Sequence, residues 1–191
     1  RFVKPLPFTL TGAQKRVLSE IMEDLEKEKS MNRLIQGDVG SGKTIVALTA
    51  LLTAVDNKMQ SALMVPTEIL AEQHYLNIRP YCESLGIELS LITSALKGKD
   101  RQKLYENIRT GKTQIVVGTH SLIQKDIQFK KLGLAVVDEQ HRFGVLQRDA
   151  MGKKGDHPHL LIMTATPIPR SLALTLYGDM DVSLLDEFPP G

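Results

Sequence analysis

The sequence has almost no cysteine and no long apolar run. Cys82 is the only cysteine among 191 residues, so an intrachain disulfide is excluded and we expect a reducing, cytoplasmic compartment. No stretch of about 18 or more apolar residues occurs, and no signal-peptide pattern precedes the first charged segment. We therefore expect no membrane partner.

A strong excess of charge is missing as well. Lys and Arg number 24, Asp and Glu number 22, and the net charge is +2, which by itself does not argue for a nucleic-acid partner. Repeats and low-complexity segments are also absent. A chain of this length, 42% hydrophobic, suits one compact domain. Because the sequence begins without methionine, we expect a piece of a longer protein.

Short apolar runs alternate with segments of helical periodicity along the chain. The apolar runs span 33–36, 61–65, 87–92, 114–118, 134–138 and 160–164, and the helical segments span 11–29, 42–57, 67–78, 98–109 and 169–178. This alternation predicts an α/β domain with a mostly parallel central sheet and helices on both faces. Residues 1–10 are expected to be extended, and Pro80 to kink or end its helix.

Polar clusters directly follow five of the predicted strands. Their sequences are GDVGSGKT, PTE, GTH, DEQH and TATP. In parallel sheets, ligands bind at the carboxyl ends of the strands. The five clusters therefore predict one functional edge.

The first cluster fits the phosphate-binding pattern G-x-x-x-x-G-K-[ST]. It consists of Gly37, Asp38, Val39, Gly40, Ser41, Gly42, Lys43 and Thr44. Glycines allow backbone N–H groups to surround phosphate oxygens, Lys43 is expected to reach the β- and γ-phosphates, and the Thr44 hydroxyl to hold Mg²⁺. A chance match in a chain this long arises about once in a hundred from average residue usage. The segment therefore predicts a nucleotide site.

An acidic pair, Asp138 and Glu139, stands at the end of the apolar run that begins at residue 134. Alone, such a pair is usually a solvated strand end. With a phosphate loop upstream, we expect Asp138 to bind Mg²⁺, directly or through water, and Glu139 to orient or deprotonate the attacking water. The sequence has no N-K-x-D for guanine and no D-x-x-G here. The pair therefore favours an ATPase over a GTPase or a small-molecule kinase.

Taken in order, these motifs resemble the DNA helicase motors of superfamily two. The stretches DEQHRFGVLQR and TATPIPR are similar to the RecG branch, ATP-dependent DNA translocases that remodel branched DNA and stalled replication forks in recombination and repair. The resemblance runs from about residue 6 to the end. A second resemblance is to the transcription-repair coupling factor motor, which usually has another glutamate where Gln140 stands.

The resemblance implies one RecA-like P-loop lobe spanning residues 1–191. Its implied partners are branched or forked DNA, a second RecA-like lobe and a wedge domain, with residues 186–191 beginning the linker to the second lobe. Arginine fingers supplied by a partner lobe contribute about 10³ to 10⁵ in rate. We therefore expect the isolated lobe to bind ATP weakly and to hydrolyse it very slowly.

Several further residues gain a role from the resemblance, each beside a plainer interpretation. Gln14 corresponds to an adenine-reading glutamine, with Phe8 a neighbour of the base, but Thr11 and Gln14 also form a capping-box pattern. Pro66, Thr67, Thr119 and His120 correspond to residues that line a DNA path. Helix capping by Thr67 and Ser121 is the alternative.

A last group is implied to couple the ATP site to DNA or to the second lobe. Gln140 and His141 stand beside the acidic pair and would sense the γ-phosphate, whereas Arg170 would serve interlobe or DNA contacts or remain a solvated charge. Thr164 and Thr166 would link the two sites. In the alternative, Thr166 caps a helix that begins at Pro167.

Two functions stay open at this point: an ATP-hydrolysing translocase lobe, and a nucleotide-gated nucleic-acid-binding module without efficient hydrolysis. Binding needs Lys43, whereas hydrolysis also needs a group that activates water. The presence of Glu139 favours the motor.

Overall fold

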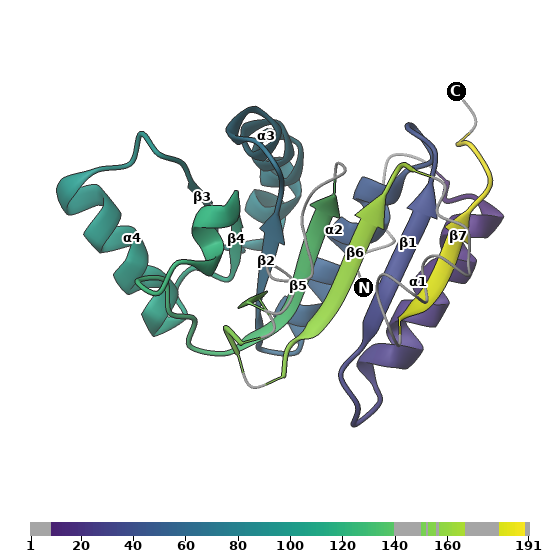
Figure 1. The fold of residues 1–191 in the computed structure, drawn as a ribbon, viewed down its shortest axis with the longest axis horizontal. Helices are drawn as coiled ribbons and strands as arrows, with labels where there is room; N and C mark the ends of the chain where they lie inside the picture. Colours follow the sequence, from purple (N-terminus) through teal and green to yellow (C-terminus); the bar gives the residue numbers. More distant parts are fainter. Residues whose placement is uncertain (1–8, 140–149, 152, 156, 167–179, 190–191) are drawn as a thin grey trace.

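The central feature of the fold is a seven-stranded sheet. The computed structural model describes residues 9–139, 150–151, 153–155, 157–166 and 180–189. The strands are β1 (Asn32–Gly37), β2 (Gln60–Met64), β3 (Leu89–Ile92), β4 (Ile115–Gly118), β5 (Leu132–Glu139), β6 (His159–Thr164) and β7 (Asp181–Leu185). Their order is β3-β4-β2-β5-β6-β1-β7, and every neighbouring pair is parallel (Figure 1).

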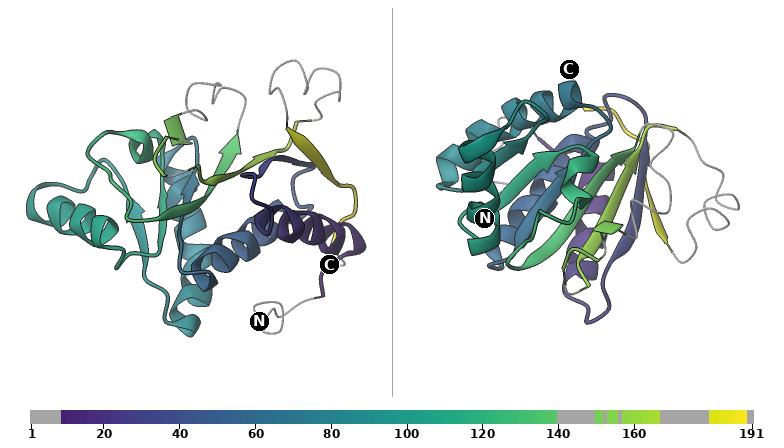
Figure 2. Two further views of the ribbon diagram at one scale, coloured as in Figure 1. Left: turned by 90° about the horizontal axis from the view of Figure 1, so that it is seen from below. Right: turned by 60° about the vertical axis from the view of Figure 1, so that its left-hand side comes forward.

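Helices cover both faces of this sheet. They are α1 (Gly12–Leu25), α2 (Lys43–Asp56), α3 (Glu68–Leu85), α4 (Gly98–Thr110) and the 3₁₀ helix η1 (His120–Ile123). The first three pack on one face, while α4 and η1 pack on the other (Figure 2). No helix within the described ranges is both long and apolar enough to cross a membrane.

The two layers follow from alternation along the buried strands. Ile35 and Val136 belong to the apolar cluster beneath α1–α3, whereas their neighbours Leu34 and Val137 belong to the cluster on the opposite face. Because both faces are covered, the strands read as continuous apolar runs in the sequence. The predicted fold, a RecA-like α/β lobe with a parallel sheet between helical layers, is confirmed.

The prediction that Pro80 ends its helix is wrong, and the alternative that it kinks the helix stays a prediction. Helix α3 continues through Pro80 to Leu85 and ends at Gly86, whose φ is 66°. Pro80 is exposed, while Cys82 beyond it is buried and Tyr81 packs against the same core. Apolar surface buried beyond the proline stabilises the continued helix and works against the roughly 3 kcal/mol that proline costs inside a helix.

Strand β7 was not predicted from the sequence. It lies at the edge of the sheet beside β1, and of its five residues only Ser183 and Leu185 are buried. Ser183 takes a core position because its hydroxyl bonds Arg33 of β1 (2.7 Å) and Glu20 of α1. A serine at a buried position breaks the apolar pattern by which the other strands are found. The helix predicted over 169–178 lies outside the described residues.

Candidate nucleotide and nucleic-acid site

The carboxyl ends of three adjacent strands bring three of the predicted clusters together: GDVGSGKT, DEQH and TATP. Strand β6 lies between β1 and β5, and Thr164 is in register with both Gln36 and Glu139. The phosphate loop after β1 and the acidic pair at the end of β5 therefore flank the same position of β6. This is the arrangement expected where nucleotides bind parallel sheets.

The loop between β1 and α2 has the backbone of a phosphate cradle. Gly40 has φ 88° and Gly42 has φ 85°, values that other residues rarely adopt. Gly37 is needed for space, because a Cβ there would lie 2.6 Å from Ser41 Oγ and 2.8 Å from the Leu185 Cβ of β7. Gly42 is followed directly by the first turn of α2, whose N–H groups carry partial positive charge.

The Lys43 ammonium lies over this loop. Its Nζ donates to the carbonyl oxygens of Gly37 (2.6 Å) and Asp38 (2.8 Å). Burial lowers the pKa of Lys43, and the nearby carboxylates of Asp138 and Asp38 act in the opposite direction. An ammonium has three donors, so one remains for a phosphate oxygen.

Gln14 of α1 forms a hydrogen bond with the loop, a contact that the sequence did not indicate. Its amide completes the capping box with Thr11, as predicted, and its Nε2 also donates to the Ser41 carbonyl (3.0 Å). The side chain is 1% exposed. The Ser41 hydroxyl is buried and has no partner within the described part of the chain. The adenine-reading role of Gln14 stays a prediction.

Asp138 has a partner that was missed, His74 of α3. His74 Nε2 lies 3.1 Å from Asp138 Oδ2. The carboxylate is partly exposed, whereas the whole His74 residue is buried at 8% exposure. A signal was present in the sequence: Ala71, His74 and Ile78 form one buried stripe at helical spacing, and a polar residue on such a stripe needs a polar partner.

The oxygen groups at this edge suit Mg²⁺. The carboxylate of Asp138 ends a strand, and Thr44 is exposed in the first turn of α2. In the described ranges no group of three or more acidic, histidine or cysteine side chains forms a closed metal cage. Mg²⁺ commonly takes one or two protein oxygens together with phosphates and water, so the residues present fit it.

The clusters after β2 and β4 lie farther along the same carboxyl-end side of the parallel sheet, and this part of it is called the second edge below. Met64 is in register with Gly118, and Val65 N donates to the Gly118 carbonyl (3.0 Å), so Pro66 and Thr67 lie near Thr119 and His120. Thr67 caps α3, accepting from Leu70 N.

The predicted cap at Ser121 is wrong. The helix η1 begins at His120, one residue earlier, which places Ser121 inside it. Thr119 is the cap position and makes no side-chain cap bond. The Ser121 hydroxyl is buried without a partner in the described part.

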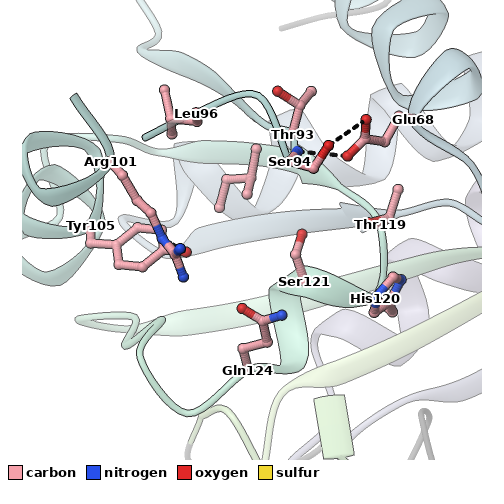
Figure 3. A pocket seen from close by; sticks show the side chains of 11 residues that line it. Glu68, Thr93, Ser94, Leu96, Arg101, Tyr105, Thr119, His120, Ser121 and Gln124 are labelled. Atoms are coloured by element: carbon pink, nitrogen blue, oxygen red, sulfur yellow. Dashed lines mark hydrogen bonds between the residues drawn. The ribbon is translucent and has the colours of Figure 1, made fainter. Parts of the chain in front are cut away.

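A hollow of about 260 Å³ opens beside this second edge (Figure 3). Glu68 accepts from the backbone N–H (2.6 Å) and hydroxyl of Ser94 at one side, and Arg101 lies 5.2 Å from the centre of the Tyr105 ring at the other. Neither Arg101 nor Tyr105 was predicted from the sequence. Side chains lining the hollow include Glu68, Ser94, Arg101, Tyr105, Thr119, His120, Ser121 and Gln124.

The structure describes only some of the remaining predicted residues. The Thr164 and Thr166 hydroxyls lie 2.8 Å apart, and Thr166 N donates to the Thr164 hydroxyl (3.2 Å). These two contacts hold Thr166 against the end of β6. Predicted residues outside the described part are Phe8, Gln140, His141, Arg170 and the side chain of Glu139.

Proteins similar to this chain include DNA helicases. The DEAD/DEAH box helicase family matches residues 11–175. The chain is 56% identical to the ATP-dependent DNA helicase RecG of Haemophilus influenzae and 55% identical to that of Bacillus subtilis, over its whole length in both cases. It spans about 28% of the length of each of these relatives.

Solved structures agree with the sequence matches. The structure of RecG bound to a three-way DNA junction superimposes with a TM-score of 0.86 at 49% identity, over all of this chain and 25% of that one. The Pyrococcus furiosus Hef helicase domain matches at 18% identity with a TM-score of 0.67, over 91% of this chain and 38% of that one, which shows the shared fold. The chain belongs to the DEAD/DEAH box helicase family, and the relatives that it resembles over its whole length are RecG helicases.

Proposed function

We propose that this chain is the ATP-binding first lobe of an ATP-dependent DNA helicase that remodels branched DNA or stalled forks. One observation carries the proposal: the sheet places a phosphate loop beside Asp138 at one edge and two polar clusters beside each other at a neighbouring edge. A nucleotide and a nucleic-acid strand can then contact the same rigid sheet. Similarity to RecG helicases over the whole of this chain supports DNA as the track.

Each residue of the nucleotide edge has a distinct role in this proposal. The loop N–H groups and Lys43 bind the phosphates, while Thr44 and Asp138 hold Mg²⁺, which neutralises phosphate charge when bound. Glu139 takes the proton of the attacking water or orients it. Gln14 holds the loop through the hydrogen bond from its Nε2 to the Ser41 carbonyl.

The second edge would bind the sugar-phosphate backbone. Pro66, Thr67, Thr119 and His120 would contact phosphates without reading bases, which suits a protein that moves along DNA. Arg101, close to these residues, adds a positive charge at the rim of the hollow. Thr164 and Thr166 would transmit changes at the nucleotide to this edge.

The proposal includes partners beyond this chain. A second RecA-like lobe would close the nucleotide cleft, with residues 186–191 leading toward it and arginine fingers completing catalysis. A wedge domain would open the DNA fork. A lobe acting on bacterial DNA would work in the cytoplasm.

The proposal is tested by Glu139→Gln in the full-length protein that carries this lobe. We expect ATP binding to persist and ATP hydrolysis stimulated by forked DNA to fall by about 10² to 10⁴, because the water loses its base. The measurements are steady-state ATPase with and without DNA, and binding of a fluorescent ATP analogue. Lys43→Ala is the control and should lose binding itself.

Two results would contradict the proposal. Full DNA-stimulated hydrolysis by Glu139→Gln would remove the assigned role of that glutamate. Wild-type protein that binds ATP but shows no hydrolysis with any DNA would instead indicate a nucleotide-gated binding module.

A further inference from the structure

The contact between His74 and Asp138 joins two elements that lie far apart in the sequence. His74 belongs to α3 and Asp138 to the end of β5, and the atoms in contact are His74 Nε2 and Asp138 Oδ2 at 3.1 Å. Asp138 is the carboxylate assigned to Mg²⁺. A hydrogen bond to one carboxylate oxygen restricts the rotation of the group.

The other ring nitrogen, Nδ1, indicates which tautomer of His74 makes this contact. His74 Nδ1 is buried and has no partner within the described residues. A proton there would leave an N–H donor buried and unsatisfied, which costs more than an unused lone pair on a ring nitrogen. The neutral tautomer with its proton on Nε2 therefore fits, and Nε2–H donates to the carboxylate.

The helix that carries His74 begins at the other edge of the site. Thr67 caps α3 at the proposed nucleic-acid edge, and His74 follows seven residues later, about 10 Å along the axis. Ala71 and Ile78 are buried on the same stripe, at 0% and 1% exposure, so His74 is held between packed neighbours. A displacement of the start of α3 therefore also moves the imidazole, because closely packed side chains transmit such a shift.

We propose that His74 is a positioning residue: it holds the Asp138 carboxylate in the orientation that Mg²⁺ requires, and through α3 it makes that orientation depend on nucleic acid at Thr67. The inference rests on the proposed function and assigns a physical link between the nucleotide edge and the nucleic-acid edge. Nucleic acid seated on the α3 cap shifts the helix and so adjusts the metal ligand. By reciprocity, Mg²⁺ and nucleotide change nucleic-acid affinity through the same contact.

The test compares three substitutions at His74 in the full-length protein. His74→Leu keeps the volume and removes the donor, His74→Asn ends too short to reach Asp138, and His74→Gln keeps a donor at similar reach. Hydrogen-bond partners of metal ligands typically contribute about 10- to 100-fold in metal affinity. We therefore expect His74→Leu and His74→Asn to raise, by this factor, the Mg²⁺ concentration needed for half-maximal binding of a fluorescent ATP analogue.

A second readout measures the link itself. Affinity for a fluorescent forked DNA is measured without nucleotide and with Mg²⁺ and a non-hydrolysable ATP analogue. The ratio of the two affinities should move toward one in His74→Leu and His74→Asn. In His74→Gln the ratio should stay close to the wild-type value. Ile78→Val is the matched control, because it loosens the same stripe without touching a carboxylate.

The outcomes separate this inference from the proposed function. Wild-type binding of Mg²⁺ and ATP together with unchanged Mg²⁺ dependence in His74→Leu and His74→Asn would overturn the inference alone. Equal effects of Ile78→Val would do the same, since the role would then be packing. If the leucine variant does not fold, as judged by thermal unfolding, the asparagine variant decides. Wild-type protein that binds no ATP would contradict the proposed function as well.

Discussion

At the scale of single residues, two glycines of the phosphate loop are required for different reasons. Both Gly40 and Gly42 have positive φ, so any side chain is strained at either position. Gly40 has open space around a Cβ, with no atom within 4 Å, whereas a Cβ on Gly42 would lie 2.1 Å from Gln14 Nε2. Gln14 is buried and bonded on both sides, so it cannot move away without breaking a hydrogen bond.

This difference predicts unequal effects of the same substitution. Gly40→Ala should lower the free energy of unfolding by about 1–2 kcal/mol, the cost of a left-handed conformation. Gly42→Ala should cost about 1–3 kcal/mol more, because it also breaks a buried hydrogen bond. Urea unfolding measures both. In a Gln14→Ala background the two penalties should converge, and a gap that persists there would contradict the assigned clash.

At the scale of elements, α3 is held together across a proline. The helix keeps Pro80 because the residues beyond it pack on the core, not because its backbone hydrogen bonds are complete. Its helical geometry is therefore imposed by tertiary packing. The same helix carries Thr67 at its start and His74 two turns later, so its continuity matters to both edges of the site.

Removing the proline should therefore stabilise the protein. Pro80→Ala restores a backbone donor and removes about 3 kcal/mol of intrinsic cost, partly offset by about 0.4–1 kcal/mol of added freedom in the unfolded chain. We expect a net gain of about 2 kcal/mol in the free energy of unfolding, measured in urea. Gln73→Ala, an exposed change in the same helix, should have almost no effect. A loss of stability in Pro80→Ala would show that the ring itself contributes packing.

The elements that were predicted from the sequence are those whose pattern is local. The buried parallel strands appear as apolar runs, and the phosphate loop and acidic pair follow them in fixed order, so the sheet edge that carries the site was predictable. His74 and the bond from Gln14 to Ser41 were not, because each depends on where a second element packs. Likewise, β7 was missed because Ser183, at one of its buried positions, is paired across 150 residues of sequence.

At the scale of the whole molecule, a buried polar network joins both ends of the described chain. Arg33 of β1 is 8% exposed and pairs with Asp24 (2.7 Å) and Glu20 (3.1 Å), both on α1. The network continues through the hydroxyl of Ser183 to β7. It fixes α1 and β7 against β1, the strand that leads into the phosphate loop. Removing one partner of a buried pair typically costs about 3–5 kcal/mol.

The network predicts a specific response to acid. Burial alone would raise the pKa of Asp24, but hydrogen bonds and charges from Lys27 and Arg33 outweigh burial, and the pKa lies below its ordinary value of 3.8. A lowered pKa in the folded state means that the carboxylate stabilises the fold above pH 3.8 and that this contribution is lost as the pH falls through the folded pKa.

Asp24→Asn should therefore be less stable than wild type near neutral pH, and the difference should shrink as the pH falls through and below 3.8. Urea unfolding of both proteins across this range gives the difference directly. Asp56→Asn, which removes an exposed carboxylate at the end of α2, is the matched control. If the difference in the free energy of unfolding between wild type and Asp24→Asn stays constant with pH, the charge of the carboxylate does not hold α1 against β1. The shape of the side chain would then be what holds the two elements together.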